Sequence, residues 1–285
     1  WRVFGATIAA VLCCFVIFII TLIILGVKLF SLFNLDIPQQ EVKPQTVLCI
    51  DLAESIVDAP RVATFGEFDT TKMSFTEPLT LLHAIAAIES AATDNNIEGI
   101  CIKIDGMGTT NVANIEELRS AIERFKSSGK FVVPYDDSYT QSDYYLASVA
   151  DHIILQPEGS IEWRGVAFNS VFLKGLLDKI DAKIEVFRPT DCKFKSAVET
   201  YTRTSMSKED REQMESLANR VWSDIVADVA LSRKLDAERL KELAANLDVN
   251  HPQEALEAGL IDEIGYESTL YDYLRKQGVN TNSMN

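Results

Sequence analysis

Short apolar runs rich in Val and Ile alternate with helical patterns along most of this chain. The runs lie at residues 47–52, 99–104, 130–135, 151–156 and 183–188, and all are too short to be core helices. The helical patterns lie at residues 79–92, 114–129, 168–180, 208–235, 236–247 and 252–258. Strands that alternate with helices are typical of layered α/β domains, so we expect one such domain.

The longest helical pattern follows Ser207, which forms a sequence resembling a capping box with Asp210. Apolar residues recur along it at one-turn spacing and make a single stripe. These residues are Met214, Leu217, Val221, Ile225 and Val229. We interpret the stripe as a contact with the core rather than as a cofactor site.

Residues 4–33 form an almost entirely apolar run in which Lys28 is the only charged residue. A helix needs about 20 apolar residues to cross a bilayer, whereas cleaved signal peptides have apolar cores of roughly 7–15 residues. We therefore expect an uncleaved transmembrane anchor at residues 1–33, a polar linker at 34–46 and a folded domain at 47–285. A buried core helix is the alternative to the anchor. Because the chain starts with Trp1 rather than Met, we expect the native N-terminus to lie upstream, and we expect the folded domain outside the cytoplasm.

The folded domain is strongly acidic. The chain has 42 acidic and 27 basic residues and a formal net charge of −15, and Arg2 and Lys28 are the only charged residues before Asn34. A surface of this sign repels nucleic acid and anionic lipid, which argues against a nucleic-acid-binding protein.

The cysteines and histidines show no spacing typical of a metal site or a disulfide framework, so we expect no metal and no cofactor. Cys49 and Cys101 fall in two of the strand-like runs, and Cys192 stands alone. The three histidines are scattered, and we interpret each as a structural residue.

Lys195 is the candidate catalytic residue. It lies in the segment 191–199, beside Phe194, Ala197 and Val198. A lysine can act as a general base only when it is neutral, and burial away from water favours the neutral form. The apolar neighbours are compatible with such burial, although composition alone favours an ordinary surface lysine.

Two further segments follow strand-like runs and precede helical patterns. Residues 105–110 could present backbone N–H groups to a ligand or form a plain turn. Ser138 and Ser142 lie where a helix begins, but the Gly-x-Ser-x-Gly pattern of a nucleophile elbow is missing. A capped helix is the better interpretation of this second segment.

Several short sequences occur in an order and at a spacing that resemble the signal peptide peptidase A (protease IV) family. They are Tyr-Tyr-Leu-Ala-Ser at 144–148, Gln-Pro-Glu-Gly at 156–159, Lys-Ser-Ala-Val-Glu at 195–199, Met-Ser at 206–207 and Gly-Leu-Ile-Asp-Glu-Ile-Gly at 259–265. The resemblance covers nearly the whole chain, and it is strongest to the N-terminal half of the long, tandem-domain form.

The resemblance implies a crotonase-like fold close to that of the Clp protease subunit. It also implies a bowl-shaped homo-oligomer, a tetramer, at the bacterial cytoplasmic membrane with the folded domain on the periplasmic side. The implied activity is that of a serine endopeptidase with a Ser-Lys dyad, which degrades signal-peptide remnants in the membrane without a cofactor.

The family pattern also implies roles for individual residues. Lys195 would be the general base, and the nucleophilic serine would lie in a C-terminal half that this chain lacks. Gln141 stands where single-domain relatives carry the nucleophile, and Ser142 is one position away. Two alternatives are a non-catalytic domain that anchors or assembles a membrane complex and a crotonase-like activity on an acyl thioester.

Overall fold

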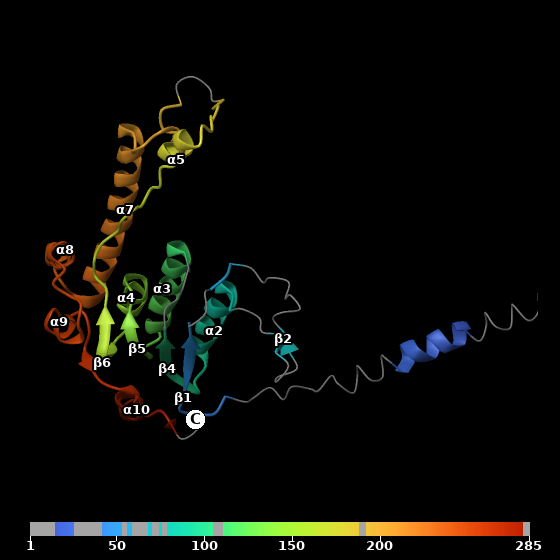
Figure 1. The fold of residues 1–285 in the computed structure, drawn as a ribbon. Helices are drawn as coiled ribbons and strands as arrows, with labels where there is room; N and C mark the ends of the chain where they lie inside the picture. The colour runs from blue at the N-terminus through green and yellow to red at the C-terminus, as the bar shows by residue number, and fades with distance from the viewer. Residues whose placement is uncertain are drawn as a thin grey trace, which may run out of the picture. The chain divides into compact units, whose positions relative to one another are not determined.

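The computed structural model describes residues 15–25, 42–52, 56–58, 68–69, 74–75, 79–104, 111–187 and 192–281. The chain divides into two units, Trp1–Val42 and Lys43–Asn285. In the first unit, residues 15–25 form a helix with exposed side chains (Figure 1). The rest of the expected anchor at 1–33 and residues 34–41 of the expected linker lie outside the described residues. Among the helices that the structure describes, none combines the length and the hydropathy needed to cross a membrane.

The second unit is built on a parallel five-stranded sheet with the strand order β1-β4-β5-β6-β7 (Figure 1). Its strands are β1 (Thr46–Asp51), β4 (Ile97–Lys103), β5 (Phe131–Tyr139), β6 (Ile154–Ile161) and β7 (Glu263–Ile264). A two-stranded antiparallel sheet consists of β2 (Phe68–Asp69) and β3 (Ser74–Phe75). The expected strands at 47–52, 99–104 and 130–135 and the α/β class are confirmed, and the expected strand at 151–156 is confirmed from Ile154 onward.

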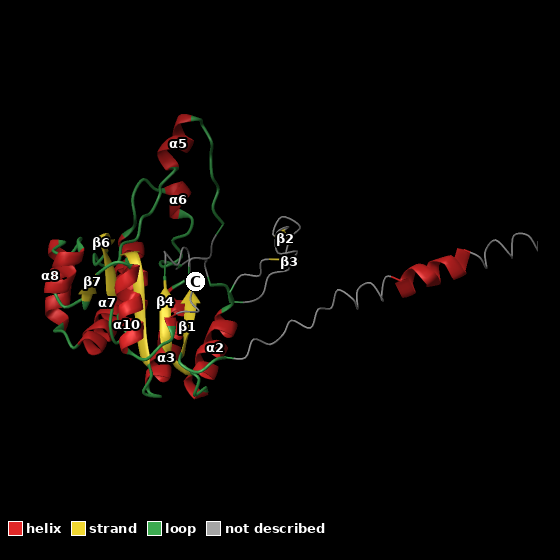
Figure 2. Cartoon of the chain, turned by 90° about the horizontal axis from the view of Figure 1, so that it is seen from below, coloured by secondary structure: helices red, strands yellow, loops and turns green. Residues whose placement is uncertain are grey.

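The five parallel strands follow one another across the sheet in chain order, so right-handed crossovers place the connecting helices on one face. These helices are α2 (Leu81–Thr93), α3 (Val112–Lys126), α4 (Gln141–Ala147), α7 (Lys208–Arg233), α8 (Ala237–Asn246) and α9 (Pro252–Glu257). Their buried residues form the main core with the sheet (Figure 2). On the other face, Leu270 and Leu274 of α10 (Glu267–Lys276) form a second, smaller core with Val133 and Ile154 of the sheet.

Several helices begin at a short polar side chain that accepts a hydrogen bond from a backbone N–H of the first turn. Thr80 caps α2 in this way through the N–H of His83, at 3.2 Å. Ser207 caps α7 through the N–H of Asp210, at 3.1 Å, which confirms the expected start of that helix. The cap of α3 is Asn111, which bonds the N–H of Asn114, so this helix begins earlier than the expected start at Asn114.

Residues 162–206, which we name the arm and of which 162–187 and 192–206 are described, leave the carboxyl edge of the sheet and join the start of α7, beyond that edge (Figure 1). The arm contains two short helices, α5 (Lys174–Lys179) and α6 (Glu199–Thr202). The expected helix at 168–180 is therefore confirmed only over α5. The expected strand at 183–188 is wrong for residues 183–187, which form no strand. Val186 and Phe187 are exposed there, so this apolar run is not a buried strand of the sheet.

The apolar stripe of α7 enters the core only in its C-terminal half. Ile225 and Val229 are buried, whereas Leu217 is 47% exposed and Met214 is half-buried. The N-terminal half of α7 extends beyond the carboxyl edge of the sheet (Figure 1), where this chain provides few neighbours. The interpretation of the whole stripe as a core contact is therefore wrong for its first two residues.

A buried arginine joins α3, α4 and α7. The Arg119 guanidinium donates hydrogen bonds to the backbone oxygen of Tyr145 at 2.6 Å, to Ser148 Oγ at 2.9 Å and to Ser232 Oγ at 2.5 Å. It also lies over the ring of Tyr145, 4.8 Å from the centroid. The hydroxyl of Tyr145 donates to Asp228 Oδ2 at 2.6 Å. Burial lowers the pKa of Arg119 and so disfavours its charged form. The surrounding acceptors oppose this effect and stabilise the charge.

Replacing this arginine tests how much the network stabilises the domain. Arg119→Ala removes the hydrogen bonds that join α3 to α4 and α7 and leaves a cavity in place of a buried side chain, so we expect the free energy of unfolding to fall by about 3 kcal/mol. Arg124→Ala is the matched control on the same helix, because Arg124 is exposed and only pairs with Glu89 at 3.1 Å. The control should change the free energy by less than about 1 kcal/mol. Urea titrations that gave equal losses for both variants would contradict the assignment.

Candidate active site

The start of α4 lies at the carboxyl edge of the sheet, directly after β5. Thr140 and Asp143 form a capping box: Thr140 Oγ1 accepts from the N–H of Asp143 at 3.3 Å, and the N–H of Thr140 donates to Asp143 Oδ2 at 3.0 Å. Asp143 is buried, whereas Ser142 is exposed. The expected capped helix is confirmed, and its first residue is Gln141.

The side chain of Gln141 is fixed by the backbone of the arm. Its Oε1 accepts hydrogen bonds from the N–H groups of Arg164 at 3.0 Å and Gly165 at 2.8 Å. Its Nε2 donates to the carbonyl oxygen of Gly165 at 2.9 Å. Gly165 has φ +92°, a conformation that residues with a side chain rarely adopt. Donor and acceptor of one amide thus hold the root of the arm against the start of α4.

Trp163 anchors the root of the arm in the main core. Its ring is fully buried and lies 5.7 Å from that of Tyr144 on α4 and 4.9 Å from that of Trp222 on α7. Its indole N–H donates to the backbone oxygen of Leu240 at 2.8 Å, so the polar atom of the buried ring is satisfied. The arm therefore leaves the sheet from a fixed point.

A buried carboxylate holds the end of β4 beside β5. Asp136 is 6% exposed and accepts a hydrogen bond from the N–H of Ile104 at 3.0 Å. Its other oxygen accepts from the N–H of Asp137 at 2.7 Å, where the pairing of β5 with β6 is irregular. Residues 105–110, the expected ligand-binding loop or turn, lie outside the described residues.

Lys195 lies on the arm, in an exposed turn four residues before Glu199, the first residue of α6. Its N–H donates to the carbonyl oxygen of Cys192 at 3.2 Å. The outgoing and returning segments of the arm meet where the N–H of Leu173 donates to the carbonyl oxygen of Thr200 at 2.6 Å. Lys195 lies in the outer part of the arm, beyond this crossing. The chain itself does not bury Lys195 as its apolar neighbours suggested, and its catalytic role stays a prediction.

The candidate residues lie on different elements. Lys195 is on the arm, Ser138 on β5 and Ser142 on α4. Among the described residues, neither serine makes a hydrogen bond with Lys195. The described structure therefore places Lys195 on a different element from each of these two serines.

Glu199 fixes the return of the arm. Its carboxylate is 8% exposed and accepts a hydrogen bond from the N–H of Ser207, the cap of α7, at 2.9 Å. Arg203 lies 3.9 Å from the same carboxylate. The sequence did not predict this hydrogen bond between Glu199 and Ser207. A side chain that binds the cap of a helix eight residues later follows no periodic pattern in the sequence.

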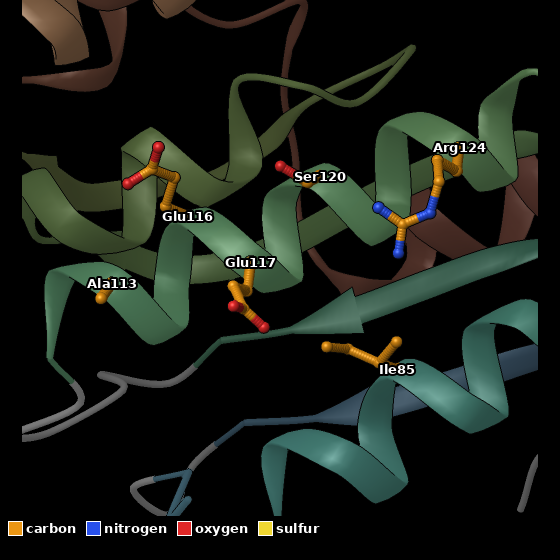
Figure 3. Close-up of a pocket in the computed structure, with 6 residues that line it drawn as sticks. All are labelled: Ile85, Ala113, Glu116, Glu117, Ser120 and Arg124. Carbon is orange, nitrogen blue, oxygen red and sulfur yellow. The ribbon is translucent and has the colours of Figure 1, made fainter.

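A hollow of about 540 Å³ lies beside the lysine turn. Phe194 lines it from the arm, and Met214 and Leu217 line it from α7, with Glu212 and Arg220 among the polar residues. The hollow therefore has an apolar floor next to the candidate base. A second hollow of about 530 Å³ lies between α2 and α3 and is lined by Ile85, Ala113, Glu116, Glu117, Ser120 and Arg124 (Figure 3). It includes none of the candidate residues.

Comparisons with known proteins define the class of this chain. The family model for peptidase family S49 matches residues 124–281. Protease 4 of Salmonella typhi is 30% identical over 246 residues, which cover 84% of this chain and 39% of that protein. The chloroplastic serine protease SPPA of Arabidopsis thaliana is 28% identical over 243 residues, which cover 84% of this chain and 33% of that protein.

The chain belongs to peptidase family S49, a family of serine-type peptidases. This confirms the expected relationship to protease IV at the level of the family, and the parallel α/β sheet is consistent with a fold of the Clp protease and crotonase type. The chain spans 39% of the length of the Salmonella typhi protease, 33% of that of the Arabidopsis thaliana protease and 30% of that of Protease 4 of Haemophilus influenzae.

The contact of Gln141 with Gly165 predicts a local effect on the arm. In Gln141→Ala the three hydrogen bonds are lost, so the amides of Arg164 and Gly165 should exchange hydrogen about tenfold faster or more. In Gln141→Glu a carboxylate can still accept both bonds and only the donated bond is lost, so the increase should be smaller. Exchange rates unchanged in both variants would show that the amide does not hold the arm.

Proposed function

We propose that this chain is the lysine-supplying half of a serine endopeptidase that degrades signal-peptide remnants in the bacterial cytoplasmic membrane. Lys195 is the general base, and the nucleophilic serine belongs to a C-terminal half beyond this chain. Residues 1–33 anchor the protein, and the folded domain is periplasmic. Family S49 membership and similarity to proteases of greater length support this proposal.

The observation that carries the proposal is the state of Gln141. By the family pattern this position is that of the nucleophile in single-domain relatives, and here it holds an amide that has no nucleophilic hydroxyl. The amide is also occupied, because it bonds Arg164 and Gly165 through both its donor and its acceptor. A substrate carbonyl at this position would find no attacking group, so the serine has to come from elsewhere.

The position of Lys195 supports the same conclusion. In the proposed mechanism the neutral amine takes the proton of the serine hydroxyl during attack on the peptide carbonyl, and later protonates the leaving amine. A lysine needs a water-excluded surrounding to be neutral at neutral pH. Lys195 is exposed in this chain, so the second half or a neighbouring protomer has to cover it. The apolar side of the hollow, at Phe194, Met214 and Leu217, suits a hydrophobic substrate or the covering surface, and its other lining residues are polar.

The decisive experiment compares peptidase activity on a hydrophobic signal-peptide fragment for this chain alone, for the longer protein and for its variants. Loss of a general base costs about 10²–10⁴-fold, so Lys195→Ala in the longer protein should lower kcat/KM by that factor. Lys193→Ala is the matched control, because Lys193 is exposed in the same turn, and its kcat/KM should stay within about twofold.

Cleavage by this chain alone would place the nucleophile within these residues and overturn the split dyad. Full activity of Lys195→Ala would remove Lys195 as the base.

The exposed apolar side chains of the arm support assembly into the proposed homo-oligomer. Val171, Leu176, Ile180 and Phe187 are between 57% and 91% exposed. Leu217 on α7 adds to this surface beside Phe194. Isolated exposed apolar residues are normal, but a gathering on one projecting segment is typical of an interface.

Charged substitutions test this surface. Phe187→Asp and Leu217→Asp place a carboxylate in the proposed interface, so each should raise the dissociation constant of the oligomer by about tenfold or more in sedimentation equilibrium. Leu231→Asp is the control, because Leu231 is 81% exposed but lies in the C-terminal half of α7, away from the arm. Equal weakening by all three would point to a general loss of stability instead.

The same exposed surface favours a second candidate function, a non-catalytic domain that anchors and assembles a membrane complex. A domain of this kind needs the apolar arm but not Lys195. The activity of Lys195→Ala in the longer protein separates the two functions, since an assembly domain would leave it unchanged.

A further inference from the structure

Two cysteines that lie 52 positions apart in the chain are direct neighbours across the sheet. Cys49 on β1 and Cys101 on β4 are partners in the parallel register. Side chains of partners point to the same face, and adjacent strands lie about 4.8 Å apart. Disulfide-bonded cysteines have Cα atoms roughly 4.4–6.8 Å apart, so this pair is close enough to be bridged without moving the strands.

The two thiols differ in their access to solvent. Cys101 is 1% exposed and belongs to the second core, with Val47, Val133 and Leu270. Cys49 is exposed, because β1 is the edge strand and α10 contacts β5 and β6 instead. A reagent in solution can therefore react with Cys49 directly, whereas Cys101 is shielded from it.

The neighbouring groups make Cys49 the more reactive thiol. A hydrogen bond with Cys101 is the main cause that lowers the pKa of Cys49 to about 7, the ammonium of Lys103 adds to this, and partial burial opposes it. The same hydrogen bond, together with burial, raises the pKa of Cys101 well above its ordinary value. Lys103 on β4 is itself paired with Glu267 of α10 at 2.9 Å. Asp51, the register partner of Lys103, is a further charged residue on the same face, two positions after Cys49. The accessible cysteine is thus the one that forms a thiolate more readily, and the buried one keeps its proton more firmly.

Packing alone does not account for this arrangement. A cysteine that serves as a small apolar residue is usually buried, which fits Cys101 but not Cys49. Cys192 lies on the arm and not on the sheet beside the other two cysteines. Its reactivity therefore serves as the comparison for that of Cys49. An exposed thiol whose register partner on the next strand is a buried thiol has the features of an attacking and resolving pair.

We propose that Cys49 and Cys101 form a reactive dithiol site that takes disulfides as its substrate class and closes to a reversible disulfide between β1 and β4. The Cys49 thiolate attacks one sulfur of an incoming disulfide, whose S–S bond breaks, and the released thiolate takes up a proton. Cys101 then loses its proton and attacks Cys49 Sγ in the mixed disulfide, which releases the second thiol. The two cysteines lose two electrons and two protons, and the incoming disulfide gains them as two thiols. This site does not depend on the proposed peptidase activity.

The test uses this chain with oxidised glutathione as the disulfide, followed by alkylation of free thiols and peptide mapping by mass spectrometry. We expect a Cys49–Cys101 disulfide in the native chain, which dithiothreitol reverses, and slower modification of Cys192. In Cys101→Ala the reaction should stop at the mixed disulfide of Cys49 with glutathione. In Cys49→Ala, a substitution at an exposed position, Cys101 should stay unmodified while the chain is folded. Mapping assigns each product to a residue, so Cys13 and Cys14 do not enter the result.

The pH dependence of alkylation by iodoacetamide is the second readout. The alkylation rate of Cys49 should be half-maximal near pH 7 in the native chain. In Cys101→Ala the midpoint should move toward the ordinary thiol value of roughly 8.5, with the rate at pH 7 lowered about threefold. A stable mixed disulfide on Cys49 in the native chain, or reaction of Cys49 no faster than that of Cys192, would overturn the proposal.

Discussion

The connectivity of the parallel sheet determines where everything else in the second unit lies. Because the five strands cross the sheet in chain order, right-handed crossovers send all the connecting helices to one face. The opposite face is left to α10, whose core includes no residue of β1 beyond Val47 among those described. All five strands also end at the same edge, which brings the end of β4, the start of α4 and the root of the arm together. The Gln141 contact and the exposure of Cys49 are both consequences of this one arrangement.

The arm combines a rigid root with an open outer part. Trp163, Gln141 and Glu199 fix the places where it leaves and rejoins the domain. Beyond the crossing of Leu173 with Thr200 the apolar side chains are mostly exposed, and Lys195 lies among them. Apolar surface of this extent is stable in water when a partner covers it. Attachment at both ends limits where the outer part of the arm can lie, and under the proposed function this favours the meeting of Lys195 with a nucleophile supplied from elsewhere.

Local patterns in the sequence predicted the elements whose stability is local. The runs at 47–52 and 99–104 are mostly apolar and form strands whose apolar residues are largely buried, and Ser207 starts α7 as its cap predicts. Prediction failed where an apolar pattern is not buried by this chain, at residues 168–173, at 183–187 and along the N-terminal half of α7. Apolar periodicity indicates that one face of a segment is to be buried. It does not indicate whether the same chain or a partner buries it. The order of short motifs indicated Lys195 and Gln141, but the three hydrogen bonds of Gln141 and the register of Cys49 with Cys101 depend on residues far away in the sequence.

A glutamine at the start of α4 does something that a serine at the same position does not. A serine hydroxyl is too short to donate to and accept from the backbone two residues beyond Trp163, whereas the amide reaches both the N–H and the carbonyl oxygen of Gly165. A catalytic serine also has to keep its oxygen free for the substrate. One side chain therefore cannot both attack a substrate and hold the arm. Under the proposed function another part of the protein supplies the nucleophile, so Gln141 needs no free hydroxyl and can hold the root of the arm that carries Lys195. The side chain at the position that single-domain relatives use for the nucleophile then fixes where the arm leaves the sheet.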